Sequence, residues 1–343
     1  MSHVTIRKHN HFSEIQPSDW DGLLEKSHTN VPFLRYGYLE RWWEYRGGGE
    51  WSADTQLSIY SAWQDDQLIG IAPLFYTLNP QGYKVLHLLG SVEISDYLDF
   101  IARPGSLKGF ILAFLEDIYQ DAFIDSLILV NVPQDSTSLP ALSAAAQQID
   151  WGVEIKELSH TPTIQLPSDW DTYLASIDKK QRHEIRRKLR RAQESSEKMT
   201  WHILTPSDDI EQGYLQFINL MEQDDNKRIF LTDTMRVQMR HIMEWAFSEG
   251  ILQLSFLKLN DQPAAAYYCF DYQDRILVYN SGFDMTFSAY SPGWVLLGLL
   301  IQHAISQGKT HFDFMRGNEA YKYRFGATDS FVMQVNLKRQ ADR

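Results

Sequence analysis

The stretch that decides the fold covers residues 291–317 and reads SPGWVLLGLLIQHAISQGKTHFDFMRG. It predicts a helix that opens on Pro292 and Gly293 and has an apolar body, followed by a short strand at 310–315. Proline is tolerated in a first helical turn because its missing N–H would be unpaired there anyway. A strand is also predicted just before it, at 275–281 (RILVYNS). Strand, helix and strand make a βαβ unit, whose ligand is expected at the carboxyl ends of the strands.

The start of this helix is a candidate anion site. Gly293 leaves backbone N–H groups uncovered at the positive end of the helix dipole, where a phosphate or carboxylate can bind. A lone glycine at a helix start is a weak motif, so an ordinary buried crossover without a ligand stays open as the alternative.

The bulk composition narrows the class of protein. A chain of 343 residues suggests two domains or one large one, and 44% hydrophobic and 13% aromatic residues are enough for a sizeable core. A net charge of −12 disfavours general affinity for nucleic acid. The single cysteine, Cys269, excludes an internal disulfide and a multi-cysteine zinc site, and no His pair has helical metal-ligand spacing. With neither a secretory signal nor a membrane-length apolar run, we expect a soluble cytoplasmic protein without a metal.

The two halves of the chain repeat one order of predicted elements. LSIYSAWQDDQLIGIAPLF at 57–75 matches LSFLKLNDQPAAAYYCF at 254–270 in pattern, and each reads as a strand, a turn and a strand. RPGSLKGFILAFLEDI at 103–118 matches SPGWVLLGLLIQHAI at 291–305, and each reads as a helix opened by Pro-Gly. We interpret this as two copies of one α/β unit. The predicted domains are 1–160 and 161–343.

The second copy carries a strongly basic predicted helix. KKQRHEIRRKLRR, residues 179–191, has a net charge of +7. At helical periodicity its apolar residues form one stripe and its arginines cover roughly the opposite half of the circumference. Because like charges at i and i+4 destabilise a helix, this density favours binding of an anion: a phosphate-bearing ligand, an acidic acceptor or nucleic acid. A merely solvated basic face is the alternative.

Several motifs resemble a known family. These are Y-x-S-G-x-D followed by SPG (Tyr279, Ser281, Gly282, Asp284, Ser291, Pro292, Gly293), DF-x-R-G-x-E-x-YK-x-x-F (Asp313, Phe314, Arg316, Gly317, Glu319, Tyr321, Lys322, Phe325), PF-x-x-x-x-Y (Pro32, Phe33, Tyr38) and K-x-R-x-x-I-R-x-x-x-R (Lys180, Arg182, Ile185, Arg186, Arg190). Together they look like the tandem-GNAT acyltransferases. The subgroup resembled is that of the BioF2-like or CelD-like acetyltransferases, relatives of the FemAB peptidoglycan aminoacyltransferases.

The resemblance implies an α/β (α+β) fold of two tandem GNAT-like domains, each a mixed, mostly antiparallel sheet flanked by helices. Acetyl-CoA or another acyl-CoA would bind only in the second domain, in the gap between the strands at 275–281 and 310–315. The implied donor-binding residues are Tyr279, Asn280, Ser281, Ser291, Pro292, Gly293 and Trp294. The implied acceptor-binding residues are Lys180, Arg182, Arg186, Arg316, Lys322, Phe33 and Tyr38.

Transfer of an acyl group to an amine needs an acceptor for the amine's proton and a proton for the departing thiolate. We expect Asp313 to act as base or orienting group, Tyr321 as acid and Asp284 as the reserve base. Asp313 could instead cap the segment that follows it.

The implied chemistry leaves alternatives for the donor. The usual GNAT loop has Gln or Arg and then Gly or Ala at its outer positions, where this chain has Tyr290 and Val295. This departure leaves room for an aminoacyl-tRNA donor, as in the FemAB relatives, acting on a peptidoglycan-like or peptide amine. Otherwise the acceptor is a small-molecule, glycan or peptide amine. A non-catalytic binding module is the third alternative.

Overall fold

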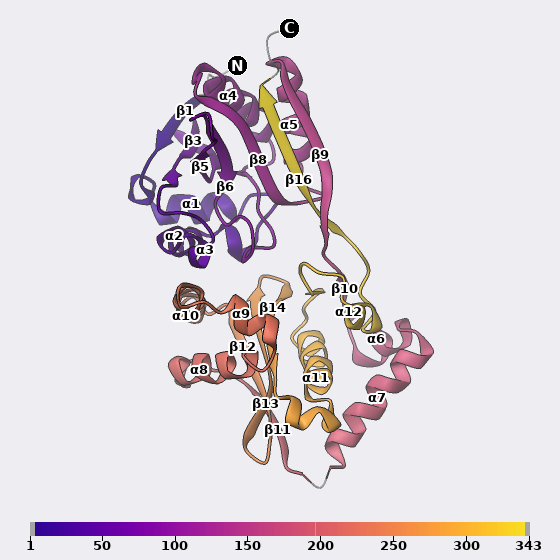
Figure 1. The fold of residues 1–343 in the computed structure, drawn as a ribbon. Helices are drawn as coiled ribbons and strands as arrows, with labels where there is room; N and C mark the ends of the chain where they lie inside the picture. The colour runs from indigo at the N-terminus through magenta and orange to yellow at the C-terminus, as the bar shows by residue number, and fades with distance from the viewer. Residues whose placement is uncertain (1–3, 196, 340–343) are drawn as a thin grey trace. The chain divides into compact units, whose positions relative to one another are not determined.

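The computed structural model describes residues 4–195 and 197–339. They divide into two units (Figure 1). Unit 1 comprises residues 4–159 together with 331–339, and unit 2 comprises residues 160–330.

Unit 1 holds two sheets. Its strands are β1 (Thr5–His9), β2 (Gln56–Leu57), β3 (Ile59–Gln64), β4 (Gln67–Ala72), β5 (Leu74–Leu78), β6 (Lys84–Leu88), β7 (Ile101–Ala102), β8 (Ile124–Pro133), β9 (Trp151–His160) and β16 (Phe331–Arg339). Among the described residues one sheet has the order β1-β3-β4-β7 and the other β2-β5-β6-β8-β16-β9. β6 and β8 are parallel, as a crossover through a helix requires, whereas β5 pairs with β6 and β16 with β8 in antiparallel fashion.

The helices of unit 1 cover these sheets with large apolar side chains. They are η1 (Phe12–Glu14), α1 (Pro17–Leu24), η2 (Pro32–Leu34), α2 (Tyr36–Glu44), α3 (Arg46–Gly49), α4 (Leu107–Gln120) and α5 (Ser138–Gln148). α4 buries Phe110 and Phe114, and the ring of Phe114 lies against Tyr60 on β3. Apolar residues three and four positions apart therefore give α4 its core-facing side.

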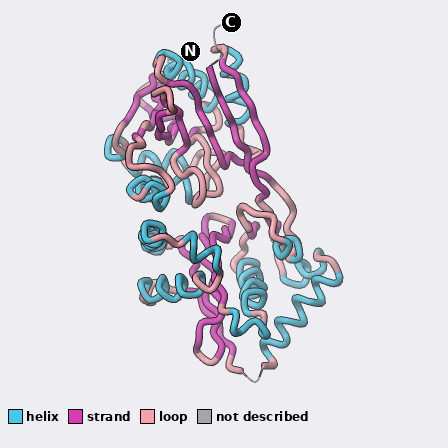
Figure 2. The backbone as a smooth tube through the Cα atoms, in the orientation of Figure 1, coloured by secondary structure: helices cyan, strands magenta, loops and turns pink. Residues whose placement is uncertain are grey.

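Unit 2 is one sheet with helices on both faces (Figure 2). Its strands are β10 (Thr163–Gln165), β11 (Met199–Ile203), β12 (Leu252–Leu259), β13 (Gln262–Tyr272), β14 (Arg275–Phe283) and β15 (His311–Asp313). Their order among the described residues is β10-β15-β14-β13-β12-β11. All neighbours are antiparallel except β14 and β15, which are parallel.

The helices of unit 2 divide between the two faces of this sheet. They are α6 (Trp170–Ser176), α7 (Lys179–Gln193), α8 (Ile210–Met221), α9 (Asp225–Phe230), α10 (Asp233–Ser248), η3 (Met285–Tyr290), α11 (Pro292–Ser306) and α12 (Ala320–Arg324). Tyr268 of β13 meets Phe217 of α8, whereas the neighbouring residues Tyr267 and Cys269 share a core cluster with α11. Because successive side chains of a strand point to opposite faces, α8 and α11 lie on opposite sides.

The structure confirms the predicted fold class, a mixed α/β fold of mostly antiparallel sheets flanked by helices. It differs from the predicted division of the chain in one respect. The predicted second domain runs to residue 343, but β16 lies between β8 and β9 in the sheet of unit 1 (Figure 1). This pairing joins strands far apart in the sequence, which local periodicity does not reveal. The second strand predicted within residues 57–75 is also divided at Pro73, because proline cannot donate to a sheet ladder.

Among residues 4–195 and 197–339, no helix combines the length and the apolar character needed to cross a membrane.

Candidate functional site

The parallel strands of unit 2 separate part of the way along β14. β14 and β15 pair at Arg275 with His311, at Ile276 with Phe312 and at Leu277 with Asp313, where β15 ends. β14 continues to Phe283, and in the described part of the chain no strand pairs with this extension on its β15 side. We call the region beyond the last parallel pair the unit 2 wedge.

A β-bulge accounts for this separation. Along β13 and β14, Tyr268 pairs with Asn280 while the next residue, Cys269, pairs with Val278, so Tyr279 has no partner. An extra residue of this kind bends its strand and strengthens its twist, and bulges often lie next to active sites. Tyr279 follows the last parallel pair by two residues, so β14 bends where β15 ends.

The start of α11 lies at this wedge. Ser291 has a left-handed backbone with φ 52° and ψ 51°, and Pro292 begins the helix. In the described part of the chain, the first helical N–H with a backbone acceptor is that of Val295, which donates to Ser291 O at 3.1 Å. The N–H groups of Gly293 and Trp294 thus remain available for an anion at the positive end of a long helix.

Gly293 is required by close packing at this helix start. A Cβ added at Gly293 would lie 2.3 Å from the ring of Phe283, the last residue of β14. The carbonyl oxygen of Gly293 also accepts a hydrogen bond from the Tyr267 hydroxyl at 3.4 Å. The helix start and the end of β14 are therefore held against each other.

Tyrosines gather at the wedge. The ring of Tyr321, on α12, meets Phe314 edge-on at 5.9 Å, directly after the end of β15. Burial, and to a lesser extent the charge of Glu319, raises the pKa of Tyr321, and burial likewise raises the pKa of Tyr267. Both phenols therefore stay protonated at neutral pH, so that each can donate a proton or a hydrogen bond.

The segment after β15 is a turn whose backbone is hydrogen-bonded to buried side chains. Asp313 is 4% exposed, and its Oδ1 accepts from the N–H of Met315 at 2.7 Å. Lys322 is 3% exposed, and its Nζ donates to the carbonyl oxygens of Met315 (3.3 Å), Arg316 (2.8 Å) and Gly317 (3.0 Å). Lys322 also pairs with Glu319 at 2.9 Å. These contacts give Lys322 a structural role in place of the predicted contact with the acceptor, and they make Asp313 a cap of the turn.

The other predicted residues of β14 and η3 lie around the same strand end. Asn280 Oδ1 accepts from the N–H of Ser281 at 2.8 Å. Tyr279 packs against Tyr268 at 4.9 Å, on the face covered by α8. Asp284 caps η3, because its Oδ1 accepts from Thr286 N at 2.9 Å and Thr286 Oγ1 at 2.7 Å. Both hydrogen bonds go to Oδ1, so capping engages one of the two carboxylate oxygens, and the role of Asp284 as reserve base stays a prediction.

Lys227 is a residue of this site that the sequence analysis missed. It lies on the short helix α9, and its Nζ donates to Ser281 O at 2.5 Å and Ser281 Oγ at 3.3 Å, on the part of β14 beyond the parallel pairing. Burial lowers the pKa of Lys227, and the charges of Asp224 and Glu319 partly offset this. No motif surrounds Lys227, so only the folded chain identifies it.

The basic helix α7 uses its arginines in different ways. Arg182 Nη1 donates to Leu174 O and Ala175 O at 3.4 Å, and Arg186 pairs with the exposed Asp171 at 3.6 Å. Lys180 is exposed. Arg182 and Arg186 thus contact α6, and the predicted role of these residues in binding the acceptor stays a prediction.

The predicted residues Phe33 and Tyr38 lie in the core of unit 1, each with no exposed surface. Their rings meet edge-on at 5.2 Å, and the Tyr38 hydroxyl donates to Ile94 O at 2.7 Å. The predicted contact with an acceptor is therefore not possible at either side chain in this structure. The aromatic pattern reflects core packing.

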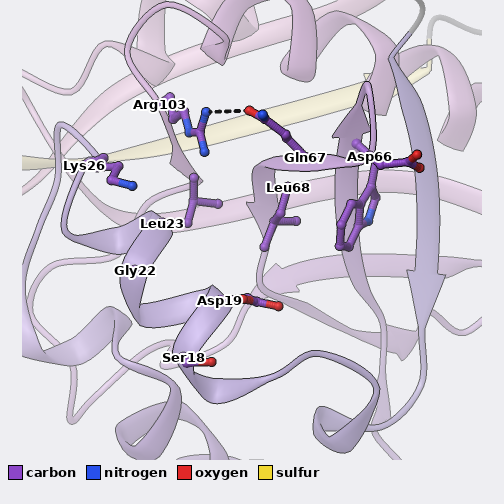
Figure 3. A pocket seen from close by; sticks show the side chains of 10 residues that line it. Ser18, Asp19, Gly22, Leu23, Lys26, Asp66, Gln67, Leu68 and Arg103 are labelled. Carbon is purple, nitrogen blue, oxygen red and sulfur yellow. Dashed lines mark hydrogen bonds between the residues drawn. The ribbon is translucent and has the colours of Figure 1, made fainter.

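A hollow of about 360 Å³ on unit 1 contains none of the predicted residues (Figure 3). It lies between α1 and the turn from β3 to β4, and Arg103 Nη1 donates there to Gln67 Oε1 at 3.2 Å. Its lining mixes Lys26 and Arg103 with Asp19 and Asp66, so its charges largely balance.

No group of three or more His, Cys, Asp and Glu side chains suited to a metal ion occurs within residues 4–195 and 197–339.

Part of the chain matches a known domain family. Residues 179–323 match the acetyltransferase (GNAT) domain family. No curated protein matches the sequence of the chain.

Solved structures share the fold across nearly the whole chain. The crystal structure of FemX is similar with a TM-score of 0.66 and 13% identity, over 96% of this chain and 96% of that one. L-PGS from Bacillus licheniformis gives a TM-score of 0.55 and 12% identity, over 95% and 92%. A tandem GNAT protein from the clavulanic acid biosynthesis pathway gives 0.51 and 11%, over 99% and 100%. Residues 179–323 thus match the acetyltransferase (GNAT) domain family, and the chain shares its fold with FemX, L-PGS and the tandem GNAT protein.

Proposed function

We propose that this protein is an N-acyltransferase that moves an acyl group, most simply acetyl, from acyl-CoA to an amine. The observation that carries the proposal is the separation of β14 from β15 beyond Leu277 and Asp313, beside the uncovered start of α11. The extension of β14 offers backbone groups that a thioester arm can pair with, and the start of α11 offers N–H groups for the pyrophosphate. The match to the GNAT domain family supports this assignment. The proposed location is the cytoplasm, where acyl-CoA is available.

The reaction requires the acceptor amine to attack the thioester carbonyl and the sulfur to leave with a proton. A backbone N–H of the β14 extension would stabilise the oxyanion of the tetrahedral intermediate. Tyr321 is the proposed proton donor to the departing sulfur, because its ring lies against Phe314, directly after the end of β15, and its phenol is protonated at neutral pH. Asp313 is the proposed orienting residue, since it caps the turn that carries Arg316. Glu319, which pairs with Lys322 and has a side chain that is 57% exposed, is the proposed acceptor of the amine's proton.

A turnover assay tests the proposal directly. We expect purified protein, acetyl-CoA and a panel of small, glycan and peptide amines to release free CoA thiol in step with acylated amine, both measured by mass spectrometry. Thiol release without any added amine would indicate simple hydrolysis and would serve as the blank. If calorimetry detects no binding of acetyl-CoA or of longer acyl-CoA thioesters, the proposal is wrong.

The alternative is transfer of an aminoacyl group from tRNA to a peptidoglycan-like or peptide amine. Two observations favour it: the likeness in fold to FemX and L-PGS, and the arginine-rich helix α7. Arginine contacts to phosphates release counterions, so tRNA binding should weaken steeply as salt rises. A flat response to salt, or no tRNA binding at low salt, would remove this alternative.

A further inference from the structure

One face of α7 borders a hollow that the predicted acceptor-binding residues do not reach. It has a volume of about 550 Å³, within the range of cavities that hold small ligands. We call it the α7 cavity, and its lining residues are Arg187, Arg190, Arg191, Glu194, Ser195 and Tyr290. These residues come from the C-terminal half of α7, the segment after it, and the end of η3.

The charge of the α7 cavity is positive and only weakly neutralised. Arg187 pairs with Glu184 at 2.8 Å and Arg190 with Glu194 at 3.9 Å, and all four side chains are at least one-third exposed. Exposed pairs of this kind contribute little, so a phosphate can replace the carboxylate at small cost. For Arg191, no ion pair or hydrogen bond occurs among the described residues. Three guanidinium groups facing one lining carboxylate favour a ligand with at least one doubly charged anionic group.

The position of the α7 cavity connects it with the donor site. Tyr290 lines the cavity and precedes Pro292, the first residue of α11, by two positions. α7 also packs along the first half of α11: Lys188 Nζ lies 4.4 Å from the centre of the Trp294 ring, and Leu189 contacts Gly298. A ligand that reaches from the cavity to the uncovered N–H groups of Gly293 and Trp294 therefore follows one continuous edge of unit 2.

We propose that the α7 cavity binds the 3′-phosphoadenosine end of CoA, with Arg187 and Arg191 on the 3′-phosphate and Tyr290 beside the base. This inference rests on the proposed function, because it assumes acyl-CoA as donor. An aromatic ring and guanidinium groups suit an adenine with an attached phosphate, and the pyrophosphate would then extend toward the start of α11. The consequence is selection of a donor that carries a 3′-phosphate over one that lacks it.

Calorimetry with adenosine 3′,5′-bisphosphate and adenosine 5′-monophosphate tests the cavity without any turnover. We expect the bisphosphate to bind at least about tenfold tighter, since a charge-assisted hydrogen bond contributes enough for that difference. Arg191→Ala and the double variant Arg187→Ala with Arg191→Ala should abolish the preference. Lys179→Ala, which removes a charge from the other end of α7, is the matched control and should keep it.

Kinetics with acyl-CoA separates this inference from the proposed function. The arginine variants should raise KM for acyl-CoA by about tenfold and leave kcat at saturating donor and KM for the amine unchanged. Normal acyl-CoA kinetics in both variants, or equal binding of the two nucleotides by the unchanged protein, would overturn the cavity assignment while the acyltransferase proposal survives. If the unchanged protein binds tRNA and not the bisphosphate, and the arginine variants lose tRNA, the occupant is the end of a tRNA and the CoA assignment is wrong.

Discussion

The two units place the same elements around their parallel strands, but they differ in what lies beside the longer strand after the parallel pairing ends. In unit 1, β6 and β8 pair in parallel up to His87 and Ile128, and β8 then continues to Pro133. The space beside this extension is taken by the protein's own chain: the N–H of Leu98 donates to Asn131 O at 2.9 Å. In unit 2 no strand pairs with the extension of β14 on its β15 side, within the described residues.

We call the space beside the β8 extension the unit 1 wedge. Side chains fix the loop that fills it. Asn131 has no exposed surface, and its Nδ2 donates to Val92 O at 3.0 Å and Ser95 O at 2.7 Å. The Tyr38 hydroxyl holds Ile94 and Ser95 from the other side. A duplicated unit can therefore keep the scaffold and lose the gap, and we propose that unit 2 alone binds the donor.

The largest expected effect tests the chemistry of the open wedge. Tyr321→Phe should lower kcat by about 100-fold, as expected when a proton donor is removed. Among the described residues no hydrogen bond is made by the Tyr321 hydroxyl, so the free energy of unfolding should change little. Tyr323→Phe, two positions away and bonded to Asp329 at 2.7 Å, should keep normal kcat. Steady-state kinetics and thermal melts of both variants decide this, and equal kcat for the two would exclude Tyr321 as the acid.

A smaller effect is expected from closing the entrance of the unit 2 wedge. Gly293→Ala places a Cβ against the ring of Phe283, so we expect donor affinity to fall about tenfold and stability to fall by 1 to 3 kcal/mol, roughly the cost of overpacking. Gly298→Ala on the same helix is the control, because its Cβ would meet Leu189 at 3.4 Å, an ordinary contact. That variant should keep donor affinity and gain helix stability of about 0.5 to 1 kcal/mol. Unchanged donor binding by Gly293→Ala would place the donor elsewhere.

The filled wedge of unit 1 should respond only in stability. Asn131→Ala leaves buried carbonyl groups without a donor, so unfolding free energy should fall by about 2 kcal/mol. Donor affinity and kcat should not change, and the exposed Asn10→Ala serves as the control in urea titrations. A change in donor affinity would show that unit 1 takes part in binding.

A pH dependence of stability, with no expected change in kcat, should also separate the units. Burial lowers the pKa of His87 to about 4, and its ring stacks on Phe75 at 5.2 Å. Between pH 6.5 and 4 the His87 ring binds a proton in the unfolded chain but not in the folded chain. The free energy of unfolding should therefore decrease as the pH is lowered, by at most about 1.4 kcal/mol per pH unit. Hydrogen exchange should show earlier opening in unit 1 than in unit 2 on acidification. His87→Gln should flatten this slope, and an unchanged slope would assign the acid sensitivity to other groups.

The elements with strong local signals could be predicted from sequence. The Pro-Gly start predicted α11 correctly at Pro292, and the apolar stripe at helical periodicity predicted α7. The separation of the strands at β14 agrees with the gap implied by the family resemblance. These features depend on residues that are neighbours in the chain.

Features that depend on long-range contacts could not be predicted. Lys227 lies 54 positions before Ser281, so no local pattern connects its ammonium to that carbonyl. Lys322 looked available for a ligand because motif spacing does not show burial. The aromatic side chains of Phe33 and Tyr38 satisfy a family pattern and a core at the same time, and only burial distinguishes the two roles.

The place of β16 has a consequence for the order in which the protein matures during translation. β16 is an interior strand of the unit 1 sheet, yet its residues leave the ribosome after the whole of unit 2. Unit 2 is thus nested between two strands of unit 1, and its ends are held together by hydrogen bonds from Thr161 N to Ser330 O (2.8 Å) and from Thr163 N to Thr328 O (2.9 Å). The nascent chain can complete the inserted domain first, while β8 and β9 wait as unpaired edges. The half that is synthesised first is therefore the half that finishes last.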